Sequence, residues 1–232
     1  MLVLFFLLLL LCGCSSDIQD SDGNLYKTVK IGKQVWMAEN LNVRTEKGSW
    51  CYANKPENCE KYGRLYTWVS VMAFPDSCYD RKCESLEKHP HQGICPDGFH
   101  VPSNDEFNEL YDYVGGIDTA GMKLKSKNGW EGEDSSDFKS TDEFGFNMLA
   151  GGYLMWYHLK RGYVDKKDFM QENFITGLWT CSSTNEVIEY YTRNAKDTIN
   201  VALVQSFATL FEKVLSLGNK KGNGFYLRCV KD

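Results

Sequence analysis

The stretch that decides the fold reads Cys95-Pro96-Asp97-Gly98-Phe99-His100-Val101-Pro102-Ser103-Asn104-Asp105-Glu106-Phe107. Pro-Asp-Gly is a strong turn signal. Ser103 and Glu106 form a capping box, in which the Ser hydroxyl accepts from a backbone N–H of the first turn and the Glu side chain reaches back. Apolar residues follow with helical spacing at 107, 110, 111 and 114, and Gly115-Gly116 ends the pattern. The stretch therefore predicts a turn and then a helix that begins at Ser103 and buries one face.

Strand and helix signals surround this helix. A second helix is predicted from Ile117 into Lys125. On the N-terminal side, the β-rich runs 25–31 and 34–37 flank Gly32-Lys33 and predict a hairpin. The apolar run 66–74 is either a short helix or a buried strand.

The C-terminal part reads mostly as strands, at 178–182, 187–192, 199–204 and 225–230. Between them, apolar residues at 207, 210, 211, 214 and 215 have helical spacing, and we expect a helix over 207–217. The stretches 50–63, 76–98 and 127–142 are loop-like. This mixture predicts one α+β domain over residues 22–232.

The first residues predict export. Residues 2–11 are ten consecutive apolar residues, too few for a membrane-spanning helix but typical of the core of a secretory signal. Leu11-Cys12-Gly13-Cys14 follows and resembles the bacterial lipobox, so we expect a signal peptide over 1–13, lipidation at Cys14 and a polar tether over 14–21. A signal normally opens with Lys or Arg, and Met1-Leu2-Val3 lacks one. Ser15 after the cysteine favours the outer membrane, on its periplasmic or cell-surface side.

Composition narrows the classes of partner. The formal net charge is −5, and the basic residues are scattered among acids, which argues against a nucleic-acid partner. Aromatic residues make up 14% of the chain, which is typical of a folded domain.

The nine cysteines stand at 12, 14, 51, 59, 78, 83, 95, 181 and 229. With the first two assigned to the signal and the lipid anchor, seven remain, of which six can form three disulfides. Short loops favour Cys51–Cys59 and Cys78–Cys83 and leave the pairing of the last three open. Disulfides persist in oxidising compartments, which agrees with export.

Eight blocks of sequence, in order, carry a family resemblance. They are 34–42 (Gln-Val-Trp-Met-Ala-Glu-Asn-Leu-Asn), 62–68 (Tyr-Gly-Arg-Leu-Tyr-Thr-Trp), 95–103, 106–107, 144–147 (Phe-Gly-Phe-Asn), 151–153 (Gly-Gly-Tyr), 179–184 (Trp-Thr-Cys-Ser-Ser-Thr) and 224–232 (Gly-Phe-Tyr-Leu-Arg-Cys-Val-Lys-Asp). Together they resemble the Fibrobacter succinogenes major paralogous domain, from about residue 20 to the last residue.

The order of these blocks is also similar to the C-type lectin-like and formylglycine-generating-enzyme group. That resemblance implies a small twisted antiparallel sheet with two flanking helices, paired N- and C-terminal strands and long irregular loops. A helix-side cysteine bridged to the last strand is usual in the group, which implies Cys95–Cys229 and leaves Cys181 outside the disulfides.

Two metals are considered. The usual calcium triplets of lectins, Glu-Pro-Asn, Gln-Pro-Asp and Trp-Asn-Asp, are absent, but an acidic loop offers carboxylate oxygens of the kind calcium takes. Its candidate ligands are Asp134, Asp137, Asp142 and Glu143, and the alternative is a solvated loop without an ion. Zinc ligands gather at 78, 83, 89, 91 and 95, although the spacing matches no common finger and disulfides compete for the cysteines. We expect no resident cofactor.

The chain also lacks the motifs Gly-x-Ser-x-Gly, His-Glu-x-x-His and the P-loop. His100, at the helix entrance, is either a catalytic residue or a structural neighbour of the cap. We expect the protein not to be an enzyme.

Aromatic residues offer a binding face. Trp36, Trp68 and Trp179 lie in the family blocks and are predicted to be core. The others lie in or beside loops, where aromatic faces stack on sugar rings; the alternative is that they cover the core. The candidate binding residues are Trp50, Trp130, Tyr153, Trp156 and Tyr157.

These features favour a membrane-anchored, non-catalytic binding or adhesion module with a polysaccharide ligand. A second hypothesis is a structural or assembly lipoprotein that binds another envelope protein. A third is a divergent metal-dependent oxidase.

Overall fold

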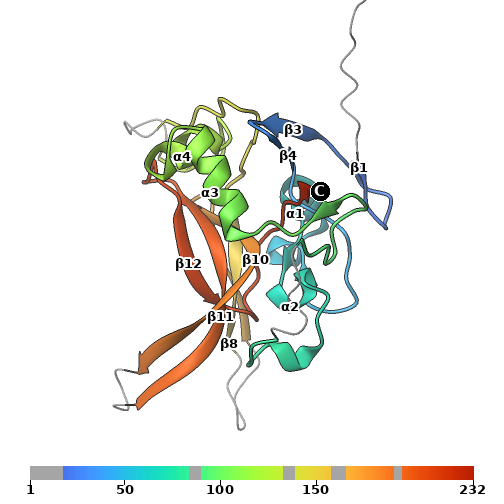
Figure 1. Ribbon diagram of the computed structural model, residues 1–232, viewed down its shortest axis with the longest axis vertical. Helices are drawn as coiled ribbons and strands as arrows, with labels where there is room; N and C mark the ends of the chain where they lie inside the picture. Colours follow the sequence, from blue (N-terminus) through green and yellow to red (C-terminus); the bar gives the residue numbers. More distant parts are fainter. Residues whose placement is uncertain (1–17, 84–89, 133–138, 158–165, 191–194) are drawn as a thin grey trace, which may run out of the picture.

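The largest sheet of the computed structural model has five strands, in the order β12-β11-β10-β8-β9 (Figure 1). The structure describes residues 18–83, 90–132, 139–157, 166–190 and 195–232. The strands are β8 (Gly151–Tyr157), β9 (Lys166–Glu172), β10 (Ile175–Tyr190), β11 (Ala195–Ala208) and β12 (Leu215–Lys220). Neighbours run antiparallel, except that β10 and β8 pair in parallel at Thr176 and Gly152. The outer halves of β10 and β11 project from the body of the protein as a long hairpin.

A four-stranded sheet joins the two ends of the domain. It has the order β3-β4-β13-β7 and contains β3 (Thr28–Ile31), β4 (Gln34–Met37), β7 (Phe99–His100) and β13 (Val230–Lys231). The predicted hairpin is confirmed as β3 and β4, with Ile31 opposite Gln34. Val230 lies between Trp36 and His100, so the last strand is inserted between an N-terminal strand and the strand that precedes the capped helix. Two small sheets pair β1 (Ile18–Gln19) with β2 (Leu25–Tyr26) and β5 (Ser49–Trp50) with β6 (Leu65–Tyr66).

The helices are short. They are α1 (Pro56–Tyr62), α2 (Trp68–Val71), α3 (Asn104–Tyr113) and α4 (Ile117–Leu124), with 3-10 turns η1 (Tyr52–Asn54) and η2 (Asp76–Cys78). Both parts of the predicted capping box are present at α3: Glu106 N donates to Ser103 Oγ over 3.2 Å, and Ser103 N donates to Glu106 Oε2 over 2.8 Å. None of the described helices has the length and apolar character needed to cross a membrane.

The core has two parts, both rich in aromatic side chains. Trp36, Trp68 and Trp179 are fully buried, as predicted. Their indole N–H groups are satisfied, since Trp68 donates to the Thr180 carbonyl over 2.9 Å and Trp179 to the Tyr66 carbonyl over 2.7 Å. The residues of one part pack around Trp68 and Trp179, and those of the other around Trp36 and the apolar face of α3.

The expected helix over 207–217 is wrong. Phe207 lies in β11, which ends at Ala208; a turn follows, and Leu215 begins β12. The apolar spacing does not mark one face, because Phe207 and Val214 are buried whereas Leu210 is 62% exposed. Six residue pairs between β11 and β12, from Val201–Lys220 to Ser206–Leu215, hold the segment as a hairpin instead.

Two other predicted strands have different bounds in the structure. The strands expected at 178–182 and 187–192 form one strand, β10, whose register against β11 shifts between Trp179 and Ser183. In the run 225–230, Phe225 and Tyr226 make only isolated bridges to Tyr66 and Leu178, and the last strand begins at Val230. The apolar run 66–74 contains the end of β6 and the short helix α2.

The α+β class is confirmed, and the chain consists mostly of sheet with few helices. The large curled sheet and its projecting hairpin go beyond the small sheet that the lectin-like group implies. Membership of that group stays a prediction.

Candidate functional site

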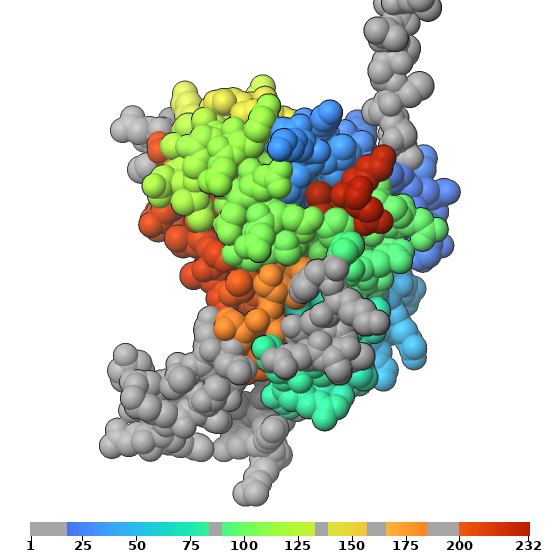
Figure 2. Space-filling model, in the orientation of Figure 1, coloured from blue at the N-terminus to red at the C-terminus, as the bar shows by residue number. Residues whose placement is uncertain are grey.

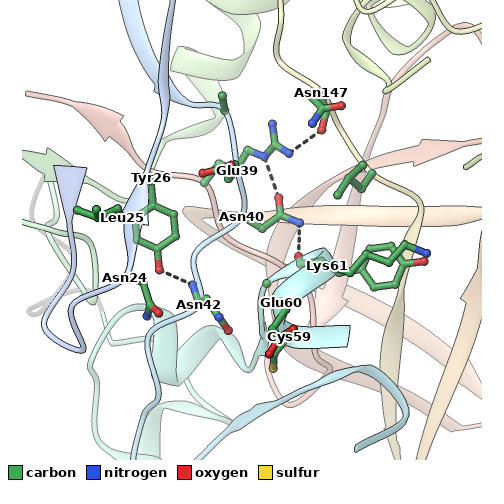
Figure 3. Close-up of a pocket in the computed structure, with 15 residues that line it drawn as sticks. Asn24, Leu25, Tyr26, Glu39, Asn40, Asn42, Cys59, Glu60, Lys61 and Asn147 are labelled. Carbon is green, nitrogen blue, oxygen red and sulfur yellow. Dashed lines mark hydrogen bonds between the residues drawn. The ribbon is translucent and has the colours of Figure 1, made fainter. Parts of the chain in front are cut away.

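A polar cavity of about 380 Å³ lies beside the β1–β2 turn (Figure 3). This volume falls within the range of small-molecule sites. Segments far apart in the sequence form its wall: the β2 region, the chain after β4, the C-terminal half of α1, residues near 147, and Arg228 shortly before β13. The lining residues are Asn24, Leu25, Tyr26, Ala38, Glu39, Asn40, Asn42, Cys59, Glu60, Lys61, Tyr62, Gly63, Asn147, Leu149 and Arg228. We call this cavity the Asn42 pocket.

Arg228 and Asn40 fix one wall of the Asn42 pocket. Arg228 is 1% exposed, and its Nε donates to Asn40 Oδ1 over 2.8 Å. The two remaining nitrogens donate to the carbonyls of Phe146 and Asn147, and the guanidinium lies 4.6 Å from the centroid of the Phe146 ring. Asn40 Nδ2 donates to the Tyr62 carbonyl over 2.8 Å, which ties α1 to the same network. These side chains are therefore committed to building the wall.

The charge of Arg228 is held without a carboxylate in salt-bridge contact among the described residues. Burial lowers the pKa of Arg228 to about 9, so the guanidinium stays protonated at neutral pH. Glu39 and Asp142 oppose that shift through space. Carbonyl oxygens and an aromatic face thus solvate a buried cation.

Tyr26 and Asp20 shape the opposite wall. Asp20 Oδ1 accepts from the backbone N–H groups of Asp22 and Asn24, both over 2.9 Å, which closes the β1–β2 turn. Tyr26 Oη donates to Asp20 Oδ2 over 2.5 Å and accepts from Asn42 N over 2.8 Å. Burial and the bond to Asp20 raise the pKa of Tyr26, so the phenol stays neutral and holds the Asn42 backbone in place.

Among the residues that line the pocket, Asn42 is the one with a buried side-chain acceptor that lacks a hydrogen bond. Its side-chain oxygen Oδ1 is buried and accepts no hydrogen bond within the described part of the chain. Leaving a buried acceptor without a donor costs about 1–3 kcal/mol, so this amide oxygen takes a hydrogen bond from a water molecule or from a ligand that replaces it. Asn42 is therefore the residue of the pocket most suited to contact a ligand.

The sequence did not reveal this pocket. Asn40 and Arg228, which bond to each other, are 188 residues apart. Both lie in blocks that carry the family resemblance, but nothing local distinguishes a wall residue from a core residue. The acidic, amide-rich stretch 39–42 was the available signal, and it gave no distance to its partners.

The structure brings together two of the five candidate aromatic residues. Lys167 Nζ lies 5.7 Å from the Trp50 ring centroid and 4.8 Å from that of Trp156. Both rings are partly buried, and a sugar that stacked there would have to displace the ammonium group.

The other candidate aromatic residues lie elsewhere. Trp130 is 4% exposed and belongs to the core, with its indole donating to Ser126 Oγ over 3.1 Å, so its expected place on an exposed binding face is wrong. Tyr153 stacks on Phe225 with centroids 5.5 Å apart. The side chain of Tyr157 lies outside the described residues.

The zinc hypothesis fails because the cysteines are oxidised. Cys78 is bridged to Cys83, and Cys95 is bridged to Cys229. His91 Nε2 lies 2.8 Å from the Met72 carbonyl, and His89 lies outside the described residues.

For calcium, Asp134 and Asp137 also lie outside the described residues. Asp142 Oδ1 accepts from Asn147 N over 2.7 Å, and Thr141 Oγ1 lies 3.4 Å from Glu143 Oε1. Within the described ranges, no group of three or more His, Cys, Asp or Glu side chains could hold a metal ion.

All three expected disulfides are formed, including Cys51–Cys59, which links the β5 end to α1. Cys181 retains its thiol and is 1% exposed. Cys14 lies outside the described residues. His100 does not line the pocket; it is buried between the carboxylates of Glu106 and Asp232.

Residues 29–231 match the family described as the Fibrobacter succinogenes major domain. The chain therefore belongs to this family. No curated protein and no solved structure matches it.

Proposed function

We propose that the chain is a membrane-anchored, non-catalytic binding module that recognises a polysaccharide through the Asn42 pocket. The observation that carries the proposal is the buried, unsatisfied Oδ1 of Asn42 in a cavity of about 380 Å³. Sugar hydroxyls are donors that can meet this oxygen, and the amide and carboxylate groups around it match the mixed donors and acceptors of a sugar ring.

The rigidity of the pocket supports binding. Arg228, Asn40 and Tyr26 are held by their own hydrogen bonds, and the Cys51–Cys59 disulfide fixes α1. A wall that is already ordered loses little conformational entropy when a ligand binds.

A screen of oligosaccharides against the mature folded chain tests the proposal. Asn42→Ala should remove most of the binding. Asn219→Ala is the matched control, because Asn219 lies on β12 and does not line the pocket. If no oligosaccharide binds a folded sample, or if both variants bind equally well, the proposal is wrong.

The membrane anchor is a separate part of the proposal and rests on the Leu11–Cys14 motif. Cys14→Ser should release the exported protein from the membrane fraction and abolish the lipid mass on the N-terminal peptide. Cys12→Ser, two residues away, should leave both unchanged. Retention of the lipid in Cys14→Ser would contradict lipidation at that cysteine.

Stacking of a sugar at Trp50 and Trp156 is a second part of the proposed ligand contact. It requires Lys167 to leave the ring faces that it now covers. Trp156→Leu should then weaken binding of long oligosaccharides more than that of short ones. An equal effect on both would show that the indole serves packing alone.

A role in binding another envelope protein is favoured by one observation. Leu210 and Phe211, in the turn between β11 and β12, are 62% and 46% exposed, and Leu217 on the edge strand is 44% exposed. A photo-crosslinking residue placed at 211 should capture a protein in cells if this role is correct, and the capture should not depend on glycan.

A further inference from the structure

We infer that the Asn42 pocket selects an uncharged sugar residue that donates hydrogen bonds, and that it disfavours acidic sugars such as uronic acids. This inference rests on the proposed function and names the ligand class of the same site. Three features of the pocket support the inference. The unsatisfied atom, Asn42 Oδ1, is a hydrogen-bond acceptor; the buried guanidinium of Arg228 already donates to partners within the protein; and the charges of the lining side chains balance.

The unsatisfied group is an acceptor. Asn42 Oδ1 can be satisfied only by a donor, such as a hydroxyl or an amide N–H. An ionised carboxylate is acceptor-only, so placed against this oxygen it would leave both groups unpaired and bring negative charge toward a partial negative charge.

The buried cation cannot compensate for an acidic ligand. Paired recognition of a carboxylate uses two N–H groups of one guanidinium edge. In Arg228, Nε and both terminal nitrogens already donate to Asn40, Phe146 and Asn147. Turning the guanidinium toward a ligand would break a network in which the side chain is 1% exposed. The positive charge of Arg228 therefore serves the fold.

The remaining charges cancel across the pocket. Glu39 and Glu60 carry negative charge, and Lys61 and Arg228 carry positive charge. In Figure 3, Glu60 and Lys61 extend from α1 on one side, and Glu39 and Asn147 lie on the other side of Asn40. Lys61 Nζ lies 4.5 Å from the centroid of the Tyr62 ring and is on the exposed face of the helix, where solvent screens it. An ionic ligand of either sign thus meets a like charge, whereas a hydroxylated ring can use both the donors and the acceptors of the lining.

Apolar residues in the lining can contact an apolar edge of the ligand. Leu25, Ala38 and Leu149 line the cavity between the polar groups. Leu25 is 61% exposed and lies beside Tyr26 (Figure 3). The C–H face of a neutral sugar ring is apolar and fits such a mixed wall.

Titration calorimetry with the mature chain tests the ligand class. The probes are neutral cello-, xylo- and chito-oligosaccharides, an oligogalacturonate as the acidic sugar, and a zwitterionic dipeptide. We expect at least one neutral oligosaccharide to bind at least ten-fold more tightly than the oligogalacturonate and the dipeptide, with an affinity that changes less than two-fold as salt is raised. Asn42→Ala should weaken that binding about ten-fold, which corresponds to one lost hydrogen bond to a buried group. Asn219→Ala should leave it unchanged.

A second variant separates loss of the acceptor from loss of the fold. Asn42→Asp keeps the acceptor oxygens and adds a negative charge, so it should retain binding of the neutral sugar and weaken any binding of oligogalacturonate further. If oligogalacturonate binds more tightly than every neutral probe, with strong salt dependence and loss in Asn42→Ala, the inference is overturned while the proposed function stands. If no sugar binds and the dipeptide binds, the proposed function fails as well.

Discussion

His100 Nε2 lies 2.6 Å from Glu106 Oε1, and this contact joins the strand β7 to the first turn of α3. The other ring nitrogen, Nδ1, lies 2.7 Å from Oδ1 of Asp232, the last residue. Figure 2 shows the C-terminal residues at the surface, between the segment around 100 and the N-terminal strands. One imidazole thus connects the start of α3 to Asp232, which gives His100 a structural role beside the helix cap.

The first prediction concerns pH. Hydrogen bonds from His100 to Glu106 and then to Asp232 raise the pKa of His100 above 6.5, against the effect of burial. A folded pKa above the unfolded value means that this stabilisation is complete below about pH 6.5 and is lost as the pH rises through the folded pKa. The free energy of unfolding, measured by denaturant titration, should therefore decrease across that range.

His100→Gln should remove this dependence on the alkaline side. His91→Gln is the control, because His91 contacts the Met72 carbonyl and, among the residues that the structure describes, no carboxylate. At acidic pH, Glu106 gives the opposite dependence, in which stability falls as the pH falls. Burial raises the pKa of Glu106, but the hydrogen bonds from His100 and Ser103 outweigh this effect and place the pKa below 4.5. That contribution is present above pH 4.5 and is lost as the pH falls through the lowered value. An unfolding free energy that rose between neutral and mildly alkaline pH would contradict the assignment.

The second prediction concerns the helix cap. Ser103→Ala removes the oxygen that accepts from Glu106 N and the partner of Glu106 Oε2, and should lower the free energy of unfolding by about 1 kcal/mol. Ser21→Ala, at an exposed serine in the β1–β2 turn, should change it by less than about 0.5 kcal/mol. Equal losses in the two variants would mean that the cap contributes nothing beyond helix propensity.

Local signals explain which parts of the fold were predictable. The capping box, the Gly-Lys hairpin turn and the short disulfide loops act over a few residues, and each was predicted from the sequence. The apolar spacing over 207–217 is equally local, yet the structure is a hairpin, because the ladder to β11 fixes the segment through contacts that spacing does not encode. Tertiary pairing overrode a helix pattern there.

The pocket was not predictable for a related reason. Tyr26, Asn42, Asn40 and Arg228 become neighbours only after β2, the chain behind β4 and the last strand are in place. The aromatic residues give the reverse lesson. A tryptophan next to a long loop suggested exposure, but Trp130 is 4% exposed, and Lys125 Nζ lies 5.0 Å from its ring centroid.

The third prediction compares two disulfides. Cys95–Cys229 closes a loop with a sequence separation of 134 residues, and Cys51–Cys59 closes one of 8. The loss of chain entropy in the unfolded state grows with the logarithm of loop length, so the double replacement Cys95→Ala with Cys229→Ala should cost about 2–3 kcal/mol more than Cys51→Ala with Cys59→Ala. Non-reducing denaturant titrations of the two double variants measure this difference. Similar losses would show that packing at each bridge, and not loop length, sets the stabilisation.

The fourth prediction concerns the backbone at the pocket. Gly63 has φ +77°, and a Cβ at this position would lie 2.8 Å from the Asn40 carbonyl oxygen and 2.8 Å from that of Leu41. Gly98 has nearly the same φ, +76°, and a Cβ there would meet nothing within 4 Å. Both alanine variants carry the cost of a positive φ, about 1 kcal/mol or more, and Gly63, with ψ −167°, also lies in a region that is essentially restricted to glycine. Only Gly63→Ala, in addition, forces Asn40 and the chain beside it to move. We therefore expect Gly63→Ala to lose about 2 kcal/mol more than Gly98→Ala in free energy of unfolding and to weaken ligand binding at the pocket. Equal stability losses would show that the wall yields to a methyl group, and would remove the argument that Asn40 and Arg228 hold the pocket rigid.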